Sequence, residues 1–224
     1  GVQAVDADGV TSLVLTPGTG TDQKSYLYIA GAIYDVGGVA NADRIARWNG
    51  SVWTALSTGL NGEPRALAIS PNGTLYIGGN FTDAAYPYLC KWNGTAFSSV
   101  GSNTYINGNV FALAFDESGN LYAGGNFTNA GGNADADRIA KWNGNQWEPL
   151  GTGTDSTVAS IFINSGKIYA AGDFTIAGGL VLTDRVAVWS NGAWQPLDID
   201  LPGTARVHAI LPASDGSLYI GGAF

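Results

Sequence analysis

The sequence predicts an all-β protein, a β-propeller built of four-stranded blades. One stretch, Leu121 to Leu150, returns in recognisable copies before and after itself. Asn-Gly pairs separate short apolar runs within these copies, and no segment has helical periodicity. A tyrosine of the first apolar run recurs every 46 to 50 residues, at Tyr28, Tyr76, Tyr122, Tyr169 and Tyr219. A period of about 40 to 50 residues that holds four short strands is typical of a propeller blade.

The copy around Leu121 contains four expected strands. The first three are Val110 to Phe115, Leu121 to Gly125 and Ile139 to Trp142, and the fourth ends near Leu150. Asn143-Gly144 separates the third from the fourth. Because a type I′ hairpin turn needs positive φ at both central residues, an Asn-Gly pair predicts that turn here. The same pair recurs at Asn49-Gly50, Asn93-Gly94 and Asn191-Gly192.

The other copies repeat this order, giving four whole blades and a half. Blade 1, about residues 10–60, has expected strands at Val10 to Leu15, Leu27 to Ala32, Ile45 to Trp48 and Val52 to Leu56. Blade 2, about 61–104, has Ala66 to Ile69, Leu75 to Gly79, Leu89 to Trp92 and Ala96 to Val100. Blade 3 is about 105–152. Blade 4, about 153–200, has Val158 to Ile163, Ile168 to Gly172, Val186 to Trp189 and Ala193 to Leu197. The partial blade, 201–224, has Val207 to Leu211 and Leu218 to Gly222.

The half blade leaves the closure of the propeller open. An open propeller exposes strand edges, which folds normally cover. Residues 1–9 resemble the end of a fourth strand and could pair beside Leu218 to Gly222. We expect either a five-bladed propeller with an incomplete closing blade or an arc of a larger propeller. In both cases residues 1–224 form a single domain, because such repeats cannot bury both faces alone.

Composition excludes several classes of partner. The chain has 224 residues, a net charge of −8 and no run of like charge. Nucleic acids and anionic membrane surfaces select basic patches, so neither is expected as a partner. No stretch of about 18 apolar residues is present, so we expect no membrane insertion. The single cysteine, Cys90, excludes a disulfide framework and occupies a position where other copies have alanine.

The repeat pattern resembles a known family. Leu-Tyr-x-Gly-Gly-x-Phe-Thr-x-Ala-Gly-Gly, followed by Arg-Ile-Ala-x-Trp-Asn-Gly-x-x-Trp-x-x-Leu, is similar to the kelch-like propeller repeats of large secreted bacterial surface proteins and fungal cortical cell-surface proteins. The resemblance implies an extracellular or cell-surface propeller, and the family has no shared catalytic residues. We expect no cofactor, and we expect the propeller to be part of a longer chain or assembly. Blade 2 departs from the pattern with Tyr86-Pro87-Tyr88.

Residues that recur in the copies are expected to serve the fold. An Asp-Arg pair precedes the third strand in three blades, with the arginines at Arg44, Arg138 and Arg185. We expect these pairs to brace the long loop against a tryptophan face rather than to bind a ligand. Thr82, Thr128 and Thr175 are expected to form loop hydrogen bonds. The recurring third-strand tryptophans, expected to be buried between blades, are Trp48, Trp92, Trp142 and Trp189.

Candidate ligand residues are those that the repeat does not specify. Arg65 and His208 occupy the second position of the first strand, where other copies carry Thr11, Phe111 and Ala159. Positions that differ between blades can form a ligand site, although a solvent-exposed histidine without a ligand is the simpler interpretation. Aromatic residues that could stack on sugars are Tyr34, Tyr86, Tyr88 and Tyr105.

Neither catalysis nor metal binding is expected. One histidine leaves few routes to a catalytic triad, no Gly-x-Ser-x-Gly is present, and no cluster has metal-ligand spacing. Asp135-Ala136-Asp137 is only a fragment of a calcium loop. A glycosidase needs only two carboxylates, but nothing selects a pair among Glu63, Asp83, Asp155 and Asp198.

The expected function is therefore a non-catalytic extracellular scaffold or adhesion module. The alternative is a carbohydrate-binding, lectin-like propeller, and a remote alternative is a glycoside-cleaving propeller enzyme. The expected partners are other protein domains or surface glycans.

Overall fold

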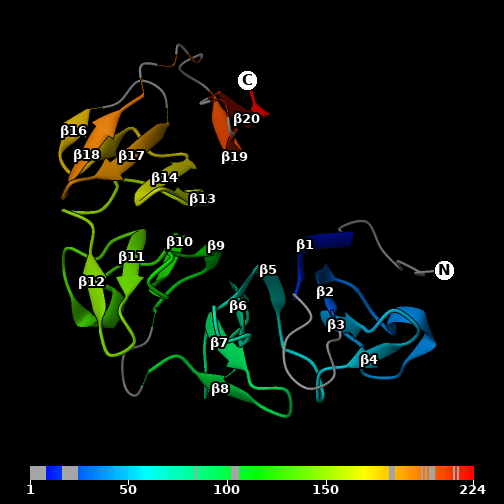
Figure 1. The fold of residues 1–224 in the computed structure, drawn as a ribbon. Coiled ribbons are helices and arrows are strands. Elements are labelled where there is room, and N and C mark those ends of the chain that lie inside the picture. The colour runs from blue at the N-terminus through cyan, green and yellow to red at the C-terminus, as the bar shows by residue number, and fades with distance from the viewer. Residues whose placement is uncertain are drawn as a thin grey trace. The chain divides into compact units, whose positions relative to one another are not determined.

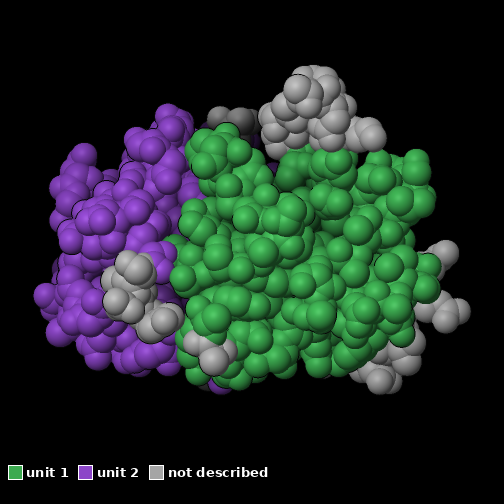
Figure 2. Space-filling view, turned by 90° about the horizontal axis from the view of Figure 1, so that it is seen from below, with its two compact units in different colours: residues 1–100 green, residues 101–224 purple. Residues whose placement is uncertain are grey.

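The computed structural model divides the chain into two compact units, Gly1–Val100 and Gly101–Phe224, coloured separately in Figure 2. The expectation of one domain over residues 1–224 stays a prediction. Tyr105, Asp184, Asp198 and the segment 1–8 lie outside the described residues. The structure describes residues 9–16, 25–83, 85–101, 106–181, 185–197, 199, 201, 205–213, 215 and 217–224.

Unit 1 contains two four-stranded antiparallel sheets whose strands pair in chain order (Figure 1). Blade 1 is β1 (Gly9–Leu15), β2 (Leu27–Ala32), β3 (Ile45–Trp48) and β4 (Trp53–Ala55), with a short 3-10 turn, η1 (Val36–Gly38). Blade 2 is β5 (Glu63–Ile69), β6 (Leu75–Asn80), β7 (Leu89–Trp92) and β8 (Phe97–Ser99).

Unit 2 contains two more sheets of the same kind and two two-stranded sheets (Figure 1). Blade 3 is β9 (Val110–Phe115), β10 (Leu121–Gly125), β11 (Ile139–Trp142) and β12 (Trp147–Pro149), with η2 (Ala130–Gly132). Blade 4 is β13 (Val158–Asn164), β14 (Lys167–Gly172), β17 (Val186–Ser190) and β18 (Ala193–Pro196). A hairpin of β15 (Ile176–Ala177) and β16 (Leu180–Val181), which we did not predict, lies in its long loop. The partial blade is β19 (Arg206–Pro212) and β20 (Leu218–Ala223). The predicted all-β fold of four-stranded blades is confirmed.

The predicted type I′ turn forms in blade 4 only. There Ser190 pairs with Ala193, and both Asn191 (φ 52°) and Gly192 (φ 77°) have positive φ. In the other blades the prediction is wrong, because tryptophan pairs with an aromatic residue five positions later and leaves a four-residue loop. In blade 3 Asn143 is not among the residues with positive φ, and its side chain accepts hydrogen bonds from the N–H groups of Asn145 and Gln146, at 2.9 and 3.0 Å. The asparagine side chain therefore caps the turn.

The core of each unit lies largely where neighbouring blades pack together. In unit 1, Tyr28 and Ile45 of blade 1 share a buried cluster with Leu75, Ile77 and Phe81 of blade 2. In unit 2 an equivalent cluster joins blades 3 and 4, and its large members are Tyr122, Ile139, Leu150, Val158, Ile168, Phe174 and Trp194. Burial of large apolar side chains between sheets is the main favourable contribution to such a repeat fold.

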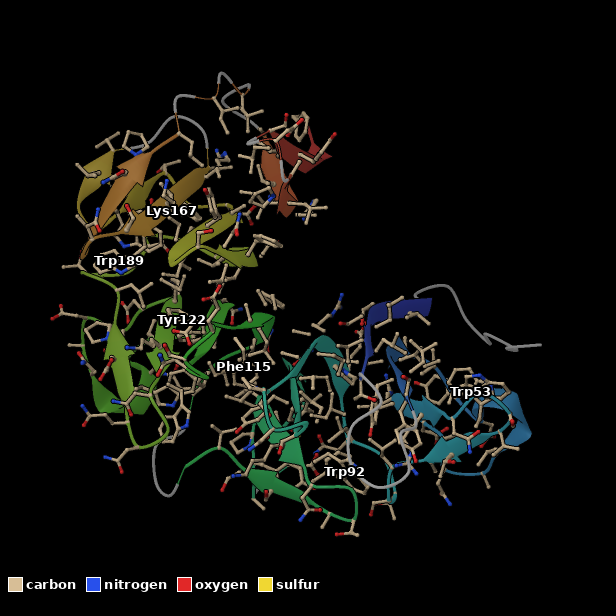
Figure 3. All side chains as sticks on the ribbon, viewed as in Figure 1. Trp53, Trp92, Phe115, Tyr122, Lys167 and Trp189 are labelled. Atoms are coloured by element: carbon tan, nitrogen blue, oxygen red, sulfur yellow. The ribbon has the colours of Figure 1, made fainter. Side chains whose placement is uncertain are left out.

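The third-strand tryptophans form aromatic pairs inside their own blades. Trp142 lies 5.5 Å from Trp147, and Trp92 lies 4.7 Å from Phe97. Trp92 also belongs to the cluster between blades 1 and 2, whereas Trp48 and Trp189 are only partly buried. Figure 3 labels Trp92 and Trp189, which lie in the second and fourth blades. The pairs explain why Trp or Phe recurs on both sides of each Asn-Gly turn.

Candidate functional site

A β-bulge lies at the same position in the first strand of every blade. The pairing of the first with the second strand skips one residue between Val10 and Ser12, and likewise between Pro64 and Ala66. Blades 3, 4 and the partial blade show the same shift. A bulge leaves one residue outside the ladder and redirects its side chain. The five bulged residues, which we call the bulge positions, are Thr11, Arg65, Phe111, Ala159 and His208.

A glycine opposite each bulge makes it possible. In blade 3 a Cβ atom on Gly125 would overlap the carbonyl oxygen of Asn109, and in blade 2 a Cβ on Gly79 would overlap that of Glu63. Only glycine allows the two backbones to approach this closely. Sequence reasoning missed the bulge, although this recurring glycine and the variable residue facing it were the signals.

Arg65 is partly engaged inside its own blade. Its Nη2 lies 2.9 Å from Oε2 of Glu63, and the Arg65 side chain is more exposed than that of Glu63. The other carboxylate oxygen of Glu63 is buried and has no hydrogen-bond partner among the described residues. His208 is exposed at the equivalent position of β19. Both sequence candidates are therefore accessible and occupy structurally equivalent places.

Thr11, the other bulge position of unit 1, makes a hydrogen bond between blades. The hydroxyl of Thr11 donates to the carbonyl oxygen of Pro64 at 2.8 Å, which joins blade 1 to blade 2. Ser12 makes a second link, since its hydroxyl oxygen accepts a hydrogen bond of 3.1 Å from the N–H of Leu67. In unit 2 Ser160 repeats the Ser12 contact by accepting from the N–H of Ile210 at 3.3 Å. Thr11 at the bulge, and the serines that follow the bulge in blades 1 and 4, thus serve blade packing.

Polar residues before the first strand hold the loop that follows the second. In blades 2 and 3, the side-chain oxygens of Asn61 and Asn107 accept from the N–H groups of Thr82 and Thr128, at 2.9 and 2.8 Å. In blade 4, Asp155 takes this role. The expected loop hydrogen bonding of the threonines is therefore present, although its main donor is the backbone.

Asp155 makes the most extensive of these contacts. Its carboxylate accepts from Thr175 N at 2.8 Å, Thr175 Oγ1 at 2.9 Å and Ile176 N at 2.8 Å. Burial, the largest single influence, disfavours ionisation, but the hydrogen bonds from Ile176 and Thr175 together outweigh it and lower the pKa of Asp155. The carboxylate of this candidate glycosidase acid is thus occupied by hydrogen bonds to the loop of its own blade.

The Asp-Arg pairs also hold the long loop, but the two residues bind different backbone groups. In blade 3, Arg138 Nη1 donates to the carbonyl oxygen of Asn126 at 2.7 Å, whereas Oδ1 of Asp137 accepts from the N–H of Asn129 at 2.7 Å. Arg185 similarly donates to Asp173 O at 2.6 Å. All three arginines adopt positive φ, with 66° at Arg44, 64° at Arg138 and 54° at Arg185.

The expected tryptophan face is not the partner of Arg44. Its guanidinium lies 4.8 Å from the ring centroid of Tyr34, a cation-π contact. In blade 2, Tyr88 takes the arginine position with a φ of 64° and is partly buried. Tyr88 therefore takes the structural place of the recurring arginine and is not an aromatic side chain that projects from the loop toward a ligand.

Tyr86 fills a gap that glycine leaves. In the other blades a glycine of the long loop faces a fourth-strand tryptophan, as Gly131 faces Trp147. Blade 2 has Phe97 at the tryptophan position, and the ring of Tyr86 packs 6.0 Å from it. Burial, followed by the charge of Asp83, raises the pKa of Tyr86. The candidate sugar-stacking residue is thus part of the packing of its blade.

Cys90 occupies a closely packed position on β7. It is fully buried, as are the alanines at the equivalent positions, Ala46, Ala140 and Ala187. Burial, followed by the charge of Asp83, raises the pKa of its thiol well above the ordinary value. A high pKa leaves little thiolate, which is the reactive form.

The described part of the chain lacks two kinds of feature. No group of three or more His, Cys, Asp or Glu side chains is placed to hold a metal ion among these residues. Within the same residues, no helix has the length and apolar character that crossing a membrane requires.

No protein-family model and no curated protein sequence matches the chain. Solved structures do match it. The chain is similar to the extracellular domain of the one-component system BT4673 from B. thetaiotaomicron, at 12% identity and a TM-score of 0.56, over 88% of this chain and 25% of that one. YCF48 bound to D1 peptide matches at 16% identity and a TM-score of 0.54, over 94% of this chain and 59% of that one. Virginiamycin B lyase from Staphylococcus aureus matches at 11% identity and a TM-score of 0.57, over 98% and 67%.

The fold is of the β-propeller type. These likenesses are too distant in sequence to carry an activity. The chain spans 25% of the length of the first of these structures and 59% of the second.

Proposed function

We propose that the chain is a non-catalytic extracellular β-propeller scaffold that binds other protein domains through exposed side chains at its bulge positions, namely Arg65 in unit 1 and His208 in unit 2. The observation that carries the proposal is the contrast between fixed and variable polar residues. Recurring residues such as Asp137 and Arg138, and Asp155 in the role that asparagine has in blades 2 and 3, hold the protein's own loops. The residue at the bulge position differs from blade to blade, although the backbone geometry is the same: it is threonine, arginine, phenylalanine, alanine and histidine in turn. Variation of the side chain on a constant backbone is typical of recognition residues.

Two further observations favour this function. The repeat resembles kelch-like repeats of secreted and cell-surface proteins, which supports an extracellular or cell-surface scaffold. One of the similar structures is an extracellular domain, and another is a propeller bound to a peptide. These observations favour a protein or peptide partner. A surface glycan is less favoured, because Tyr86 and Tyr88, the candidate sugar-stacking residues, are partly buried in the blade.

A paired binding screen tests the proposal. The purified chain and an R65A/F111A/H208A variant are screened against a displayed peptide library and a glycan array. We expect peptides that bind the original chain and lose at least tenfold in affinity, about 1.4 kcal/mol, with the variant. A V52A/V181A variant is the control, since both valines are exposed and lie outside the bulge positions.

Other results would contradict the proposal. Peptides that bind the bulge variant as well as the original chain would place recognition elsewhere. Glycan binding without peptide binding would favour the lectin-like alternative, and cleavage of an arrayed glycan would favour a glycosidase.

A further inference from the structure

Asn-Gly pairs recur along the chain, and this dipeptide is chemically reactive. The backbone nitrogen that follows an asparagine can attack the amide carbon of its side chain, and a glycine presents that nitrogen with no Cβ to obstruct the approach. The structure describes all the Asn-Gly pairs of the sequence, so their surroundings can be compared. Their asparagines are Asn49, Asn61, Asn72, Asn93, Asn107, Asn143 and Asn191.

Three of these asparagines lie in the four-residue loops between the third and fourth strands. The side-chain oxygens of Asn49, Asn93 and Asn143 each accept hydrogen bonds from two N–H groups of their own loop, at 2.9 to 3.0 Å. These bonds hold the side-chain amide against the loop backbone. The attack requires the asparagine to rotate about its side-chain and backbone bonds, so the two hydrogen bonds must break first.

The next three asparagines are held in other turns. The side-chain oxygen of Asn72 accepts from Ser70 Oγ at 2.6 Å, and the attacking nitrogen, that of Gly73, already donates to the carbonyl oxygen of Ser70 at 2.8 Å. Asn61 and Asn107 accept from the loop threonines, as described above. Each of these six asparagines therefore has a side-chain hydrogen bond that opposes the reaction.

Asn191 differs from the other six. It is exposed, has a φ of 52°, and lies in the two-residue turn between Ser190 and Ala193 that joins β17 to β18 (Figure 1). Within the part of the chain that the structure describes, its side-chain amide makes no hydrogen bond, and the N–H of Gly192 makes none. Gly192 is exposed, and a Cβ placed on it would meet nothing within 4 Å, so hydroxide can reach its nitrogen.

The hydrogen bonds should set the order of reactivity. Because a typical bond contributes modestly to stability, breaking one lowers the population of the reactive conformation about 2- to 10-fold. We propose that Asn191 is the principal site of spontaneous deamidation in the folded chain. The site includes neither Arg65 nor His208, so the proposal is independent of the function proposed above.

The reaction needs only water and hydroxide. Hydroxide removes the proton of the Gly192 nitrogen, which bonds to Cγ of Asn191, and the Cγ–Nδ2 bond breaks. The departing nitrogen takes a proton from water and leaves as ammonia. Water then opens the succinimide ring. Breaking the bond from nitrogen to Cγ gives aspartate, whereas breaking the bond from nitrogen to the main-chain carbonyl carbon gives isoaspartate.

The two products should affect the hairpin differently. Both add one negative charge, but isoaspartate also adds a carbon atom to the main chain within a two-residue turn. A type I′ turn matches the twist of its strands only with its own backbone geometry. We therefore expect isoaspartate at this position to weaken the pairing of β17 with β18, which places Trp189 opposite Trp194.

Peptide mapping of the full chain tests the proposal. The chain is incubated in mildly alkaline buffer, folded in one sample and unfolded in concentrated urea in another, and deamidation is followed by mass spectrometry. The tryptic fragment 186–206 contains Asn191 and no other asparagine, so its reaction is measured alone. We expect Asn191 to react at least tenfold faster than each of the other six in the folded chain, and all seven rates to be similar in urea.

Two variants sharpen the test. Ser70→Ala removes the hydroxyl that donates to Asn72, and deamidation of Asn72 should accelerate about 2- to 10-fold while the other five bonded asparagines, which report that the chain stays folded, remain slow. Asn191→Asp has the charge of the products without the added main-chain atom. The isoaspartate form, separated from the incubated chain, should unfold at a lower urea concentration than this variant.

Four results would overturn the proposal. Another Asn-Gly pair could react as fast as Asn191 in the folded chain, or Asn191 could itself be slowed as strongly by folding as the other six. Asn72 could remain as slow in Ser70→Ala as in the original chain. The isoaspartate form could be as stable as Asn191→Asp.

Discussion

The indole Nε1 of Trp194 donates a hydrogen bond of 2.8 Å to the carbonyl oxygen of Leu150. Both residues are buried, Trp194 on the fourth strand of blade 4 and Leu150 at the end of blade 3. The bond therefore ties consecutive blades of unit 2 together at a point where water cannot compensate for its loss.

Trp194→Phe tests this link. The substitution keeps an aromatic ring but removes the indole donor, and the N–H of Gly153, at 3.2 Å, is then the remaining donor to the carbonyl oxygen of Leu150. The free energy of unfolding should therefore fall by ~0.5 to 1.5 kcal/mol, the net contribution of one hydrogen bond. Urea unfolding of the purified variant measures it. The neighbouring exposed Gln195 provides the control, and Gln195→Ala should alter stability by less than about 0.5 kcal/mol. Equal stability of the two variants would contradict the assigned bond.

Gly178 and Gly179 form a matched pair. Both have positive φ, but a Cβ on Gly178 would lie 2.6 Å from Cδ1 of Trp194, whereas one on Gly179 would meet nothing within 4 Å. Gly179→Ala should cost only the left-handed backbone strain, ~1 to 2 kcal/mol. Gly178→Ala should cost a further ~1 to 3 kcal/mol from overpacking. Thermal and urea unfolding compare the two, and an equal loss would show that the loop does not rest on Trp194.

Trp142→Ala should be among the most destabilising substitutions of blade 3. The side chain is buried and packs 5.5 Å from Trp147, so its removal leaves a large cavity and costs ~3 to 5 kcal/mol. Val181→Ala, at a side chain that is 80% exposed, is the control and should alter stability little. An unchanged melting temperature for Trp142→Ala would refute the placement of the third strand.

Asp155 should contribute a pH-dependent part of the stability. Its pKa is lowered in the folded chain, so its contribution is complete above the unfolded value of about 3.9 and is lost as pH falls through the folded pKa. We expect the denaturant midpoints of the original chain and of Asp155→Asn to differ near pH 6 and to converge as pH falls through the folded pKa of Asp155. Thr175→Val, which removes one donor, should reduce the difference. A constant difference at all pH values would contradict the role of the charge.

Tyr86 should behave as a packing residue. Tyr86→Phe keeps the ring beside Phe97 and should alter stability by less than about 0.5 kcal/mol, whereas Tyr86→Ala should cost ~1 to 3 kcal/mol. Chemical denaturation of both variants measures these effects. The opposite result, a stable Tyr86→Ala chain that has lost binding to a ligand, would restore Tyr86 as a recognition residue.

Much of the fold could be predicted because it depends on local signals that repeat. The Tyr and Trp spacings located the strands, and the burial of Cys90 could be inferred from the alanines at its equivalent positions. The turn type was predicted less well. Asn143 and Asn191 each precede a glycine at equivalent positions, but only Asn191 adopts positive φ. The reason is the strand register, which leaves a four-residue loop in blade 3 and a two-residue turn in blade 4.

The sequence by itself determined the all-β class, the order of strands within each blade and the recurring residues that serve the fold. The tertiary structure alone showed that Arg65 and His208 lie on equivalent bulges and that Tyr86 packs against Phe97. The physical reason is that strand and turn preferences act over a few residues and are legible in the order of side chains. A bulge or an aromatic contact depends on which backbone lies opposite, and that is decided only when distant strands pair.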